Sequence, residues 1–274
     1  MNKIKRFAET KPVLFSTMVL ITSILLTEIP LASVMAPYFG KQIAHYLGMI
    51  LKQGLVGLAL FGLLARFGWK RLAGFTKRTE WKQIWLGWPM LLYCLLNTVN
   101  FLDMGIGIDF TQPVRIVLLV LANLSTGWFE ETMGRGVMLV SMLKKWGQTR
   151  LGIIKAVLVS GVLFSLGHII NMLMGRYPLT NNIAQLAYSL FSAIIFAACV
   201  LRNRAIWPVM VLHALFNLAS HLNEIVIGGT LQPAVTVIGT SETLITILLT
   251  LPLGLYGLFL LRKVEPISNE VNKE

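Results

Sequence analysis

Long apolar runs separated by short polar segments dominate the pattern of this chain. Each run is long enough, as a helix, to cross a hydrocarbon core about 30 Å thick. None alternates apolar and polar residues as the strands of a membrane β-barrel do. We therefore expect an all-α, polytopic integral membrane protein with about eight transmembrane helices in one bundle. The predicted spans are residues 12–34, 43–65, 83–102, 114–141, 153–174, 183–201, 204–221 and 243–261.

The composition agrees with a membrane protein and also bears on disulfides and on the number of domains. Hydrophobic residues make up 55% and charged residues 13% of the chain, with a mean hydropathy of +0.71, well outside the range of soluble domains. Both cysteines, Cys94 and Cys199, lie in apolar runs, so a disulfide framework is not expected. Without an internal repeat or a long linker, residues 1–274 are predicted to form one transmembrane domain, ending in a polar cytoplasmic tail at about 263–274.

The basic residues predict how the bundle is oriented. With a cytoplasmic N-terminus, 19 of the 24 Lys and Arg residues fall in segments on the inner side, so both termini are expected to be cytoplasmic. The net charge of +12 then describes loops that face an anionic leaflet, and the lipid bilayer is the expected partner. Nucleic acid is not an expected partner. The expected location is a membrane, the cell membrane if the source is bacterial.

Three charged residues interrupt the fourth predicted span, in the stretch FEETMGRG. Charges near the centre of a bilayer cost roughly 2.5 to 3.5 kcal/mol each on insertion scales, so such residues indicate function. Glu131 and Arg135 are four residues apart on one helix face, which favours an ion pair. Glu130 points about 100° away and is expected to face the bundle interior. A purely structural salt bridge is the alternative, but it leaves Glu130 without a role.

Two further polar pairs lie in later spans. Phe164 and His168 are four residues apart in the fifth span, and His213 and Asn217 are four residues apart in the seventh. Each pair shares a helix face. A glutamate and a histidine can hold and deprotonate a water molecule, while a second histidine and an amide can donate to an oxyanion. These groups are sufficient for hydrolysis without a serine or cysteine nucleophile.

The same residues leave a metal site open as the second interpretation. Glu130, His168 and His213 would supply the two imidazoles and one carboxylate of a catalytic zinc site. The HExxH spacing of many zinc peptidases is absent, and the ligands would come from three helices. No cofactor is therefore favoured, and zinc remains possible.

The three pairs together resemble the motifs of a known family. Residues 130–135 match EExxxR, residues 164–168 match FxxxH, and residues 213–217 match HxxxN. This ordered set, within about residues 114–221, is similar to that of the CPBP family, which includes CAAX prenyl endopeptidases of the Ras-converting type and bacterial relatives linked to bacteriocin immunity. The resemblance implies an eight-helix intramembrane endopeptidase with its catalytic core at about 114–221.

The resemblance also implies roles for individual residues. Glu130 and His168 would activate the water, and His213 and Asn217 would stabilise the oxyanion. The supporting residues would be Glu131, Arg135 and Phe164.

The expected function is therefore hydrolysis of peptide bonds in membrane-embedded or lipidated peptides or proteins, by a glutamate-dependent intramembrane peptidase. Three alternatives remain: a zinc-dependent version of the same protease, a non-catalytic immunity or scaffold protein, and a transporter. The intact set of polar motif residues disfavours the scaffold, and the lack of repeat symmetry disfavours the transporter.

Overall fold

The chain folds into a bundle of helices in the computed structural model, which describes residues 3–76, 81–103, 107–229, 231 and 236–267. Within these residues the only extended pairing is an isolated antiparallel bridge between Ile108 and Val226. The elements are α1 (Lys3–Thr10), α2 (Pro12–Thr27), α3 (Leu31–Phe39), α4 (Lys41–Phe67), the 3₁₀ helix η1 (Trp81–Gly87), α5 (Trp88–Asp103), α6 (Pro113–Glu131), the π-helical turn η2 (Thr132–Met138), α7 (Leu139–Trp146), α8 (Arg150–Leu166), α9 (Ile169–Leu173), α10 (Leu179–Asn203), α11 (Trp207–Ser220), the 3₁₀ turn η3 (Leu222–Ile225) and α12 (Thr240–Leu261).

Local chemistry explains several of the helix boundaries. Prolines begin α2 and α6, at the position where a missing N–H costs no hydrogen bond. The hydroxyl of Thr149 caps α8 by accepting a hydrogen bond from the N–H of Gly152. Gly68 ends α4 in the left-handed conformation, with φ at 73°, which a residue without Cβ adopts at little cost.

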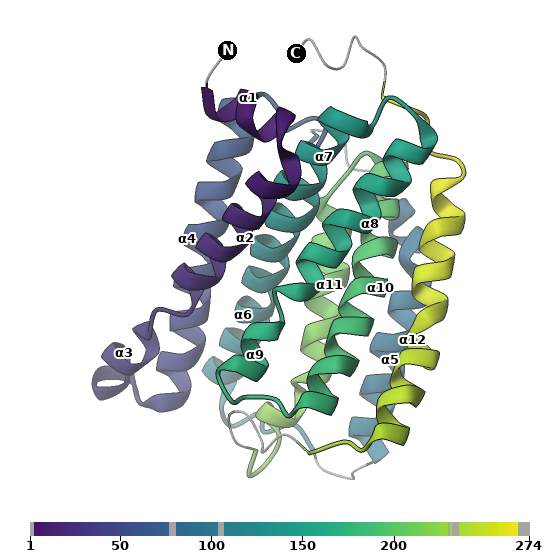
Figure 1. Cartoon of the computed structure of the whole chain (residues 1–274). Coiled ribbons are helices and arrows are strands. Elements are labelled where there is room, and N and C mark those ends of the chain that lie inside the picture. The colour runs from purple at the N-terminus through teal and green to yellow at the C-terminus, as the bar shows by residue number, and fades with distance from the viewer. Residues whose placement is uncertain (1–2, 77–80, 104–106, 230, 232–235, 268–274) are drawn as a thin grey trace.

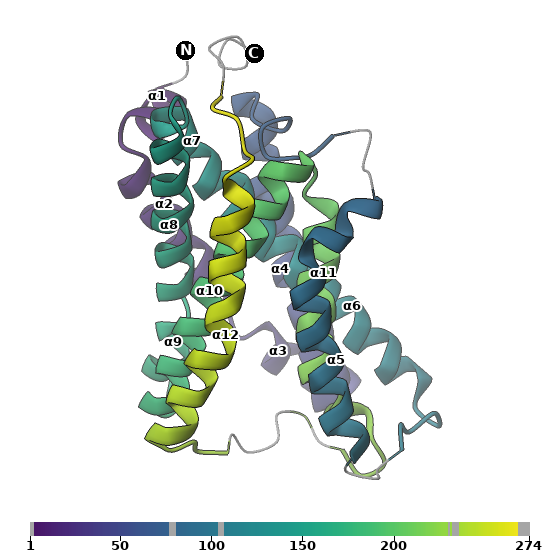
Figure 2. The same cartoon turned by 90° about the vertical axis from the view of Figure 1, so that its right-hand side faces the viewer.

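The helices run up and down across the bundle, and α1 lies at the same end as the last turn of α12 (Figures 1 and 2). Hydrogen bonds between described residues help to hold this end together. Lys145 Nζ donates to the carbonyl of Thr10 at 2.6 Å, and the N–H of Ile267 donates to the carbonyl of Gly147 at 2.9 Å. The beginning of the predicted tail is thus packed against the bundle, while its residues 268–274 lie outside the described residues.

Among the residues that the structure describes, five helical segments are long and apolar enough to cross a membrane. They are Pro12–Phe39, Lys41–Phe67, Arg150–Leu173, Leu179–Asn203 and Thr240–Leu261. The prediction of a polytopic helical membrane protein is confirmed, whereas the count of about eight spans stays a prediction. The other three predicted spans coincide with α5, with α6 and its continuation, and with the 14-residue α11, which are not among these five segments.

Three of the predicted spans are interrupted rather than continuous. The first breaks at Pro30, which separates α2 from α3 and has no N–H to continue the helix. The fourth contains the π-helical turn η2. The fifth tightens at Gly167 and His168, whose N–H groups bond carbonyls three residues back, before α9 begins. The last two interruptions coincide with the charged and polar motifs, where π turns and short 3₁₀ stretches often mark functional sites.

A second buried polar cluster anchors the start of α6. Arg115, only 6% exposed, donates to the carbonyls of Glu224 and Gly229. The hydroxyl of Tyr46, from α4, donates to Glu224 Oε2 at 2.6 Å. Arg115 is buried because η3 folds back over the start of α6. This contact fixes the helix that carries the charged motif.

Close backbone contact between α6 and α11 sets the position of the charged motif. A Cβ at Gly127 would lie 2.4 Å from the carbonyl oxygen of Met210, closer than real Cβ atoms approach. Glycine at this point therefore lets α6 touch α11 directly, one turn before the glutamates.

We predict that Gly127→Ala forces α6 away from α11 and destabilises the protein by about 1 to 3 kcal/mol, the usual cost of overpacking. The matched control is Gly62→Ala on α4, where an added Cβ meets nothing within 4 Å. Thermal unfolding of both variants in detergent should show a lower midpoint for Gly127→Ala alone. Equal midpoints would contradict the close contact.

Candidate active site

The centre of the site is the carboxylate of Glu131, which is fully buried. Its Oε1 lies 2.9 Å from Arg135 Nη1 and 2.7 Å from His213 Nδ1. Arg135 and His213 are themselves only 3% and 8% exposed. The ion pair expected between Glu131 and Arg135 is therefore present, and His213 joins it from α11.

The π-helical turn η2 places Arg135 directly after the glutamates. Glycines flank the arginine on both sides, at Gly134 and Gly136. A Cβ at Gly134 would lie 3.2 Å from the ring of Phe164, so the glycine allows α8 to approach this turn closely. The π-helical turn and the two glycines thus occur together at the point where the Arg135 side chain enters the bundle.

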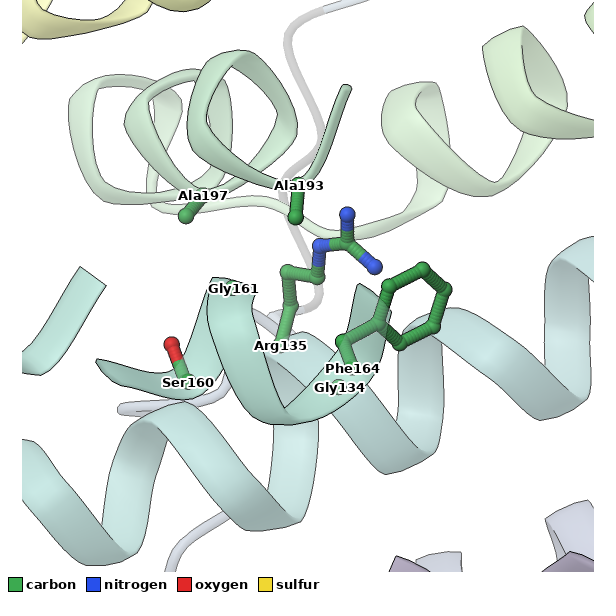
Figure 3. Close-up of a pocket in the computed structure, with 7 residues that line it drawn as sticks. All are labelled: Gly134, Arg135, Ser160, Gly161, Phe164, Ala193 and Ala197. Carbon is green, nitrogen blue, oxygen red and sulfur yellow. The ribbon is translucent and has the colours of Figure 1, made fainter. Parts of the chain in front are cut away.

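Aromatic rings cover the guanidinium of Arg135. Its Cζ lies 4.6 Å from the ring centroid of Phe164 and 5.3 Å from that of Phe196. Figure 3 shows Arg135 beside Phe164, in a tight pocket that also receives small residues from α8 and α10. A cation over aromatic faces is stabilised by the ring quadrupole, more strongly where water is excluded. The phenylalanine of the FxxxH motif therefore supports the arginine of the EExxxR motif.

Phe196 is a site residue that the sequence analysis missed. Besides facing Arg135, its ring lies 5.6 Å from that of His213, at an interplanar angle of 32°. It comes from a long buried stretch of α10 in which nearly every residue is apolar. No spacing or residue type in that stretch distinguishes this phenylalanine from ordinary core residues.

Glu130 lies apart from the ion pair. Its side chain is 18% exposed, and Oε2 is 3.5 Å from Nε2 of His213. In the part of the chain that the structure describes, Arg135 pairs only with Glu131 and not with Glu130. The two neighbouring glutamates therefore contact opposite nitrogens of one imidazole.

The other two predicted site residues lie nearby with fewer contacts. His168 sits where α8 gives way to α9, with its ring 5.5 Å from that of Phe164 and within electrostatic reach of Glu130 and His213. The amide of Asn182 donates to the His168 carbonyl at 2.9 Å and fixes this turn. Asn217 follows His213 by one turn of α11 and is half-buried, and its side-chain amide makes no hydrogen bond to any described residue.

The contacts of His213 restrict its proton chemistry. Because Nδ1 donates to Glu131, a neutral ring leaves Nε2 as an acceptor, and only the imidazolium can donate from Nε2. Glu130, Glu131 and Arg135 together carry one net negative charge when ionised. A proton on His213 would bring the net charge of the cluster to zero.

The described residues contain no group of three or more His, Cys, Asp or Glu side chains placed to hold a metal ion. The zinc set considered from the sequence, namely Glu130, His168 and His213, therefore does not converge as ligands in this structure. His213 has Nδ1 committed to Glu131.

Comparison with known proteins identifies the domain that carries these residues. Residues 112–219, less than half of the chain, match the family model of the type II CAAX prenyl endopeptidase Rce1-like domain. No curated protein and no solved structure gave a match. The matched segment runs from the start of α6 to the end of α11 and includes the whole buried cluster. Residues 112–219 of this membrane protein are therefore similar to the Rce1-like domain of type II CAAX prenyl endopeptidases.

Proposed function

We propose that this protein is an intramembrane endopeptidase in which Glu130 activates a water molecule to hydrolyse peptide bonds of membrane-associated substrates. One observation carries the proposal: Glu130 Oε2 faces His213 Nε2 at 3.5 Å, while the adjacent Glu131 is fully buried against Arg135. A partly exposed carboxylate that is not committed to the buried ion pair has the access that a general base needs.

The chemical step uses Glu130 twice. With His168 holding the water, Glu130 removes one proton as the water oxygen attacks the carbonyl carbon. The tetrahedral intermediate then breaks its C–N bond, and Glu130 returns the proton to the departing nitrogen. The products are a carboxylic acid and an amine, and no covalent bond to the enzyme is formed.

His213 and Asn217 have the complementary role of stabilising the oxyanion. As an imidazolium held by Glu131, His213 presents an Nε2–H donor toward the side of the site that Glu130 faces. The Asn217 amide, one helical turn further on, supplies a second donor. Preorganised donors of this kind typically account for several kcal/mol of the rate enhancement.

The remaining motif residues support these groups. Arg135 balances the charge of Glu131, and Phe164 covers the arginine. If Glu131 were free to move, His213 would lose both its orientation and the partner that holds its proton.

The membrane setting defines the substrate class. We infer a bundle of about eight spans with both termini cytoplasmic, and substrates that are lipidated or membrane-embedded peptides or proteins. The matching family is that of type II CAAX prenyl endopeptidases, so a prenylated C-terminal peptide is one candidate substrate. Peptide maturation or bacteriocin immunity are candidate biological roles.

We predict that Glu130→Gln abolishes cleavage of a quenched membrane-peptide library while the purified protein keeps its wild-type unfolding midpoint. Glu131→Gln should lose activity and also about 3 to 5 kcal/mol of stability, because it leaves Arg135 buried without its counter-charge. The amide substitutions are isosteric, so the pair separates chemistry from folding. Wild-type activity in Glu130→Gln would defeat the mechanism.

Removal of metal ions provides the second test. We predict that prolonged treatment with a strong chelator leaves wild-type cleavage unchanged, because the described residues provide no converging ligand set. A known zinc peptidase treated in parallel is the control for chelation. Loss of activity that returns on adding zinc would establish the metal-dependent alternative instead.

A further inference from the structure

An apolar groove lies between α1, α2 and α4, with a volume of about 630 Å³. The lining residues are Lys3, Ile4, Phe7, Phe15, Met18, Val19, Thr22, Ser23, Leu26, Val56, Ala59, Leu60 and Leu63. They recur at helical spacing, so each wall is a single face of one helix. The groove therefore follows the direction in which α2 crosses the bundle.

The length of the groove matches one leaflet of a bilayer. Along α2 it extends from Phe15 to Leu26, a rise of about 16 Å. Half of a hydrocarbon core about 30 Å thick is close to this length. A groove with this length and this lining suits a single acyl chain that lies parallel to the helices.

Positive charge is concentrated at one end of the groove. Lys3 lines it directly, and no acidic residue does. Arg66 follows Leu63 by three residues on α4, which continues the same wall toward the end where α1 lies. The groove is thus apolar along its length and basic at its mouth, the distribution that complements a chain bearing an anionic headgroup.

The groove is separate from the candidate active site. Behind it, Phe129 and Met133 belong to the same apolar cluster as Phe15 and Leu60. Glu130, on the neighbouring position of α6, instead faces α11 through His213. The helix that carries the glutamates therefore stands between the groove and the reacting groups, so a chain in the groove is not placed for cleavage.

We propose that this groove is a binding site for one anionic phospholipid, with an acyl chain between α2 and α4 and the phosphate beside Lys3 and Arg66. A zwitterionic lipid of the same chain length fits the apolar part but gains less from the basic mouth. The site is independent of proteolysis and does not rest on the proposed function. It would attach α2, whose apolar surface is largely exposed, to the rest of the bundle.

The test uses the full chain, purified in detergent and mixed with equimolar phosphatidylglycerol and phosphatidylcholine of identical acyl chains. Native mass spectrometry then measures which lipid is retained. We expect one phosphatidylglycerol per chain, favoured several-fold over phosphatidylcholine. Lys3→Gln should reduce that preference about fivefold, as expected for one basic residue near an anionic surface.

A matched pair of variants tests the groove itself. Ala59→Trp adds bulk to a groove wall and should abolish retention, whereas Leu58→Trp, at the adjacent exposed position outside the lining, should not. Gel filtration checks that both variants remain folded. Equal retention of the two lipids by the wild type, or unchanged retention in Ala59→Trp, would overturn the proposal. Displacement of the lipid by a prenylated peptide would reassign the groove to a substrate and also overturn it.

Discussion

The buried carboxylate of Glu131 is the contact on which the site depends. One of its oxygens, Oε1, meets both Arg135 and His213, and so ties α6 and η2 to α11. Through the rings of Phe164 and Phe196 around the arginine, the same contact extends to α8 and α10. The α6–η2 segment and three helices that are distant from it in sequence are thus held around one fully buried charge.

Two adjacent glutamates can have different roles because a helix turns by about 100° between them. Glu131 is fully buried and is committed to two partners, whereas Glu130 keeps 18% of its side chain exposed. The imidazole of His213 lies between them and contacts each through a different nitrogen. Glu131 fixes the orientation of the imidazole, and Glu130 faces the opposite edge of the ring. Two identical side chains therefore have different surroundings and different contacts with the same histidine.

Helical spacing was sufficient to predict part of this arrangement. It gave the pairing of Glu131 with Arg135 and the shared face of Phe164 and His168, because both depend only on contacts within one or two turns. It did not give Phe196, whose role depends on which helix packs beside η2. Local patterns carry no information about that neighbour, since an apolar residue in an apolar helix is compatible with many partners.

The fold, like the site, could be predicted only in part from the sequence. Apolar runs identified the helices, but the π-helical turn and the break before α9 depend on hydrogen bonds that shift by one residue, which hydropathy does not record. Arg115 illustrates the same limit, because its burial depends on η3 returning from more than 100 residues later to accept its hydrogen bonds. Contacts between residues so far apart in sequence cannot be predicted from local sequence patterns.

The bilayer makes these features interdependent. Charges inside a membrane protein are costly, and here Arg135 is paired with Glu131 and covered by the rings of Phe164 and Phe196. The opposite face of the same helix is apolar, with Phe129 and Met133 packed against the wall formed by α2 and α4. One helix therefore separates the polar cluster around Glu131 from the apolar groove. Because both faces are fixed by α6 and η2, a shift of that helix would disturb the proton site and the groove together.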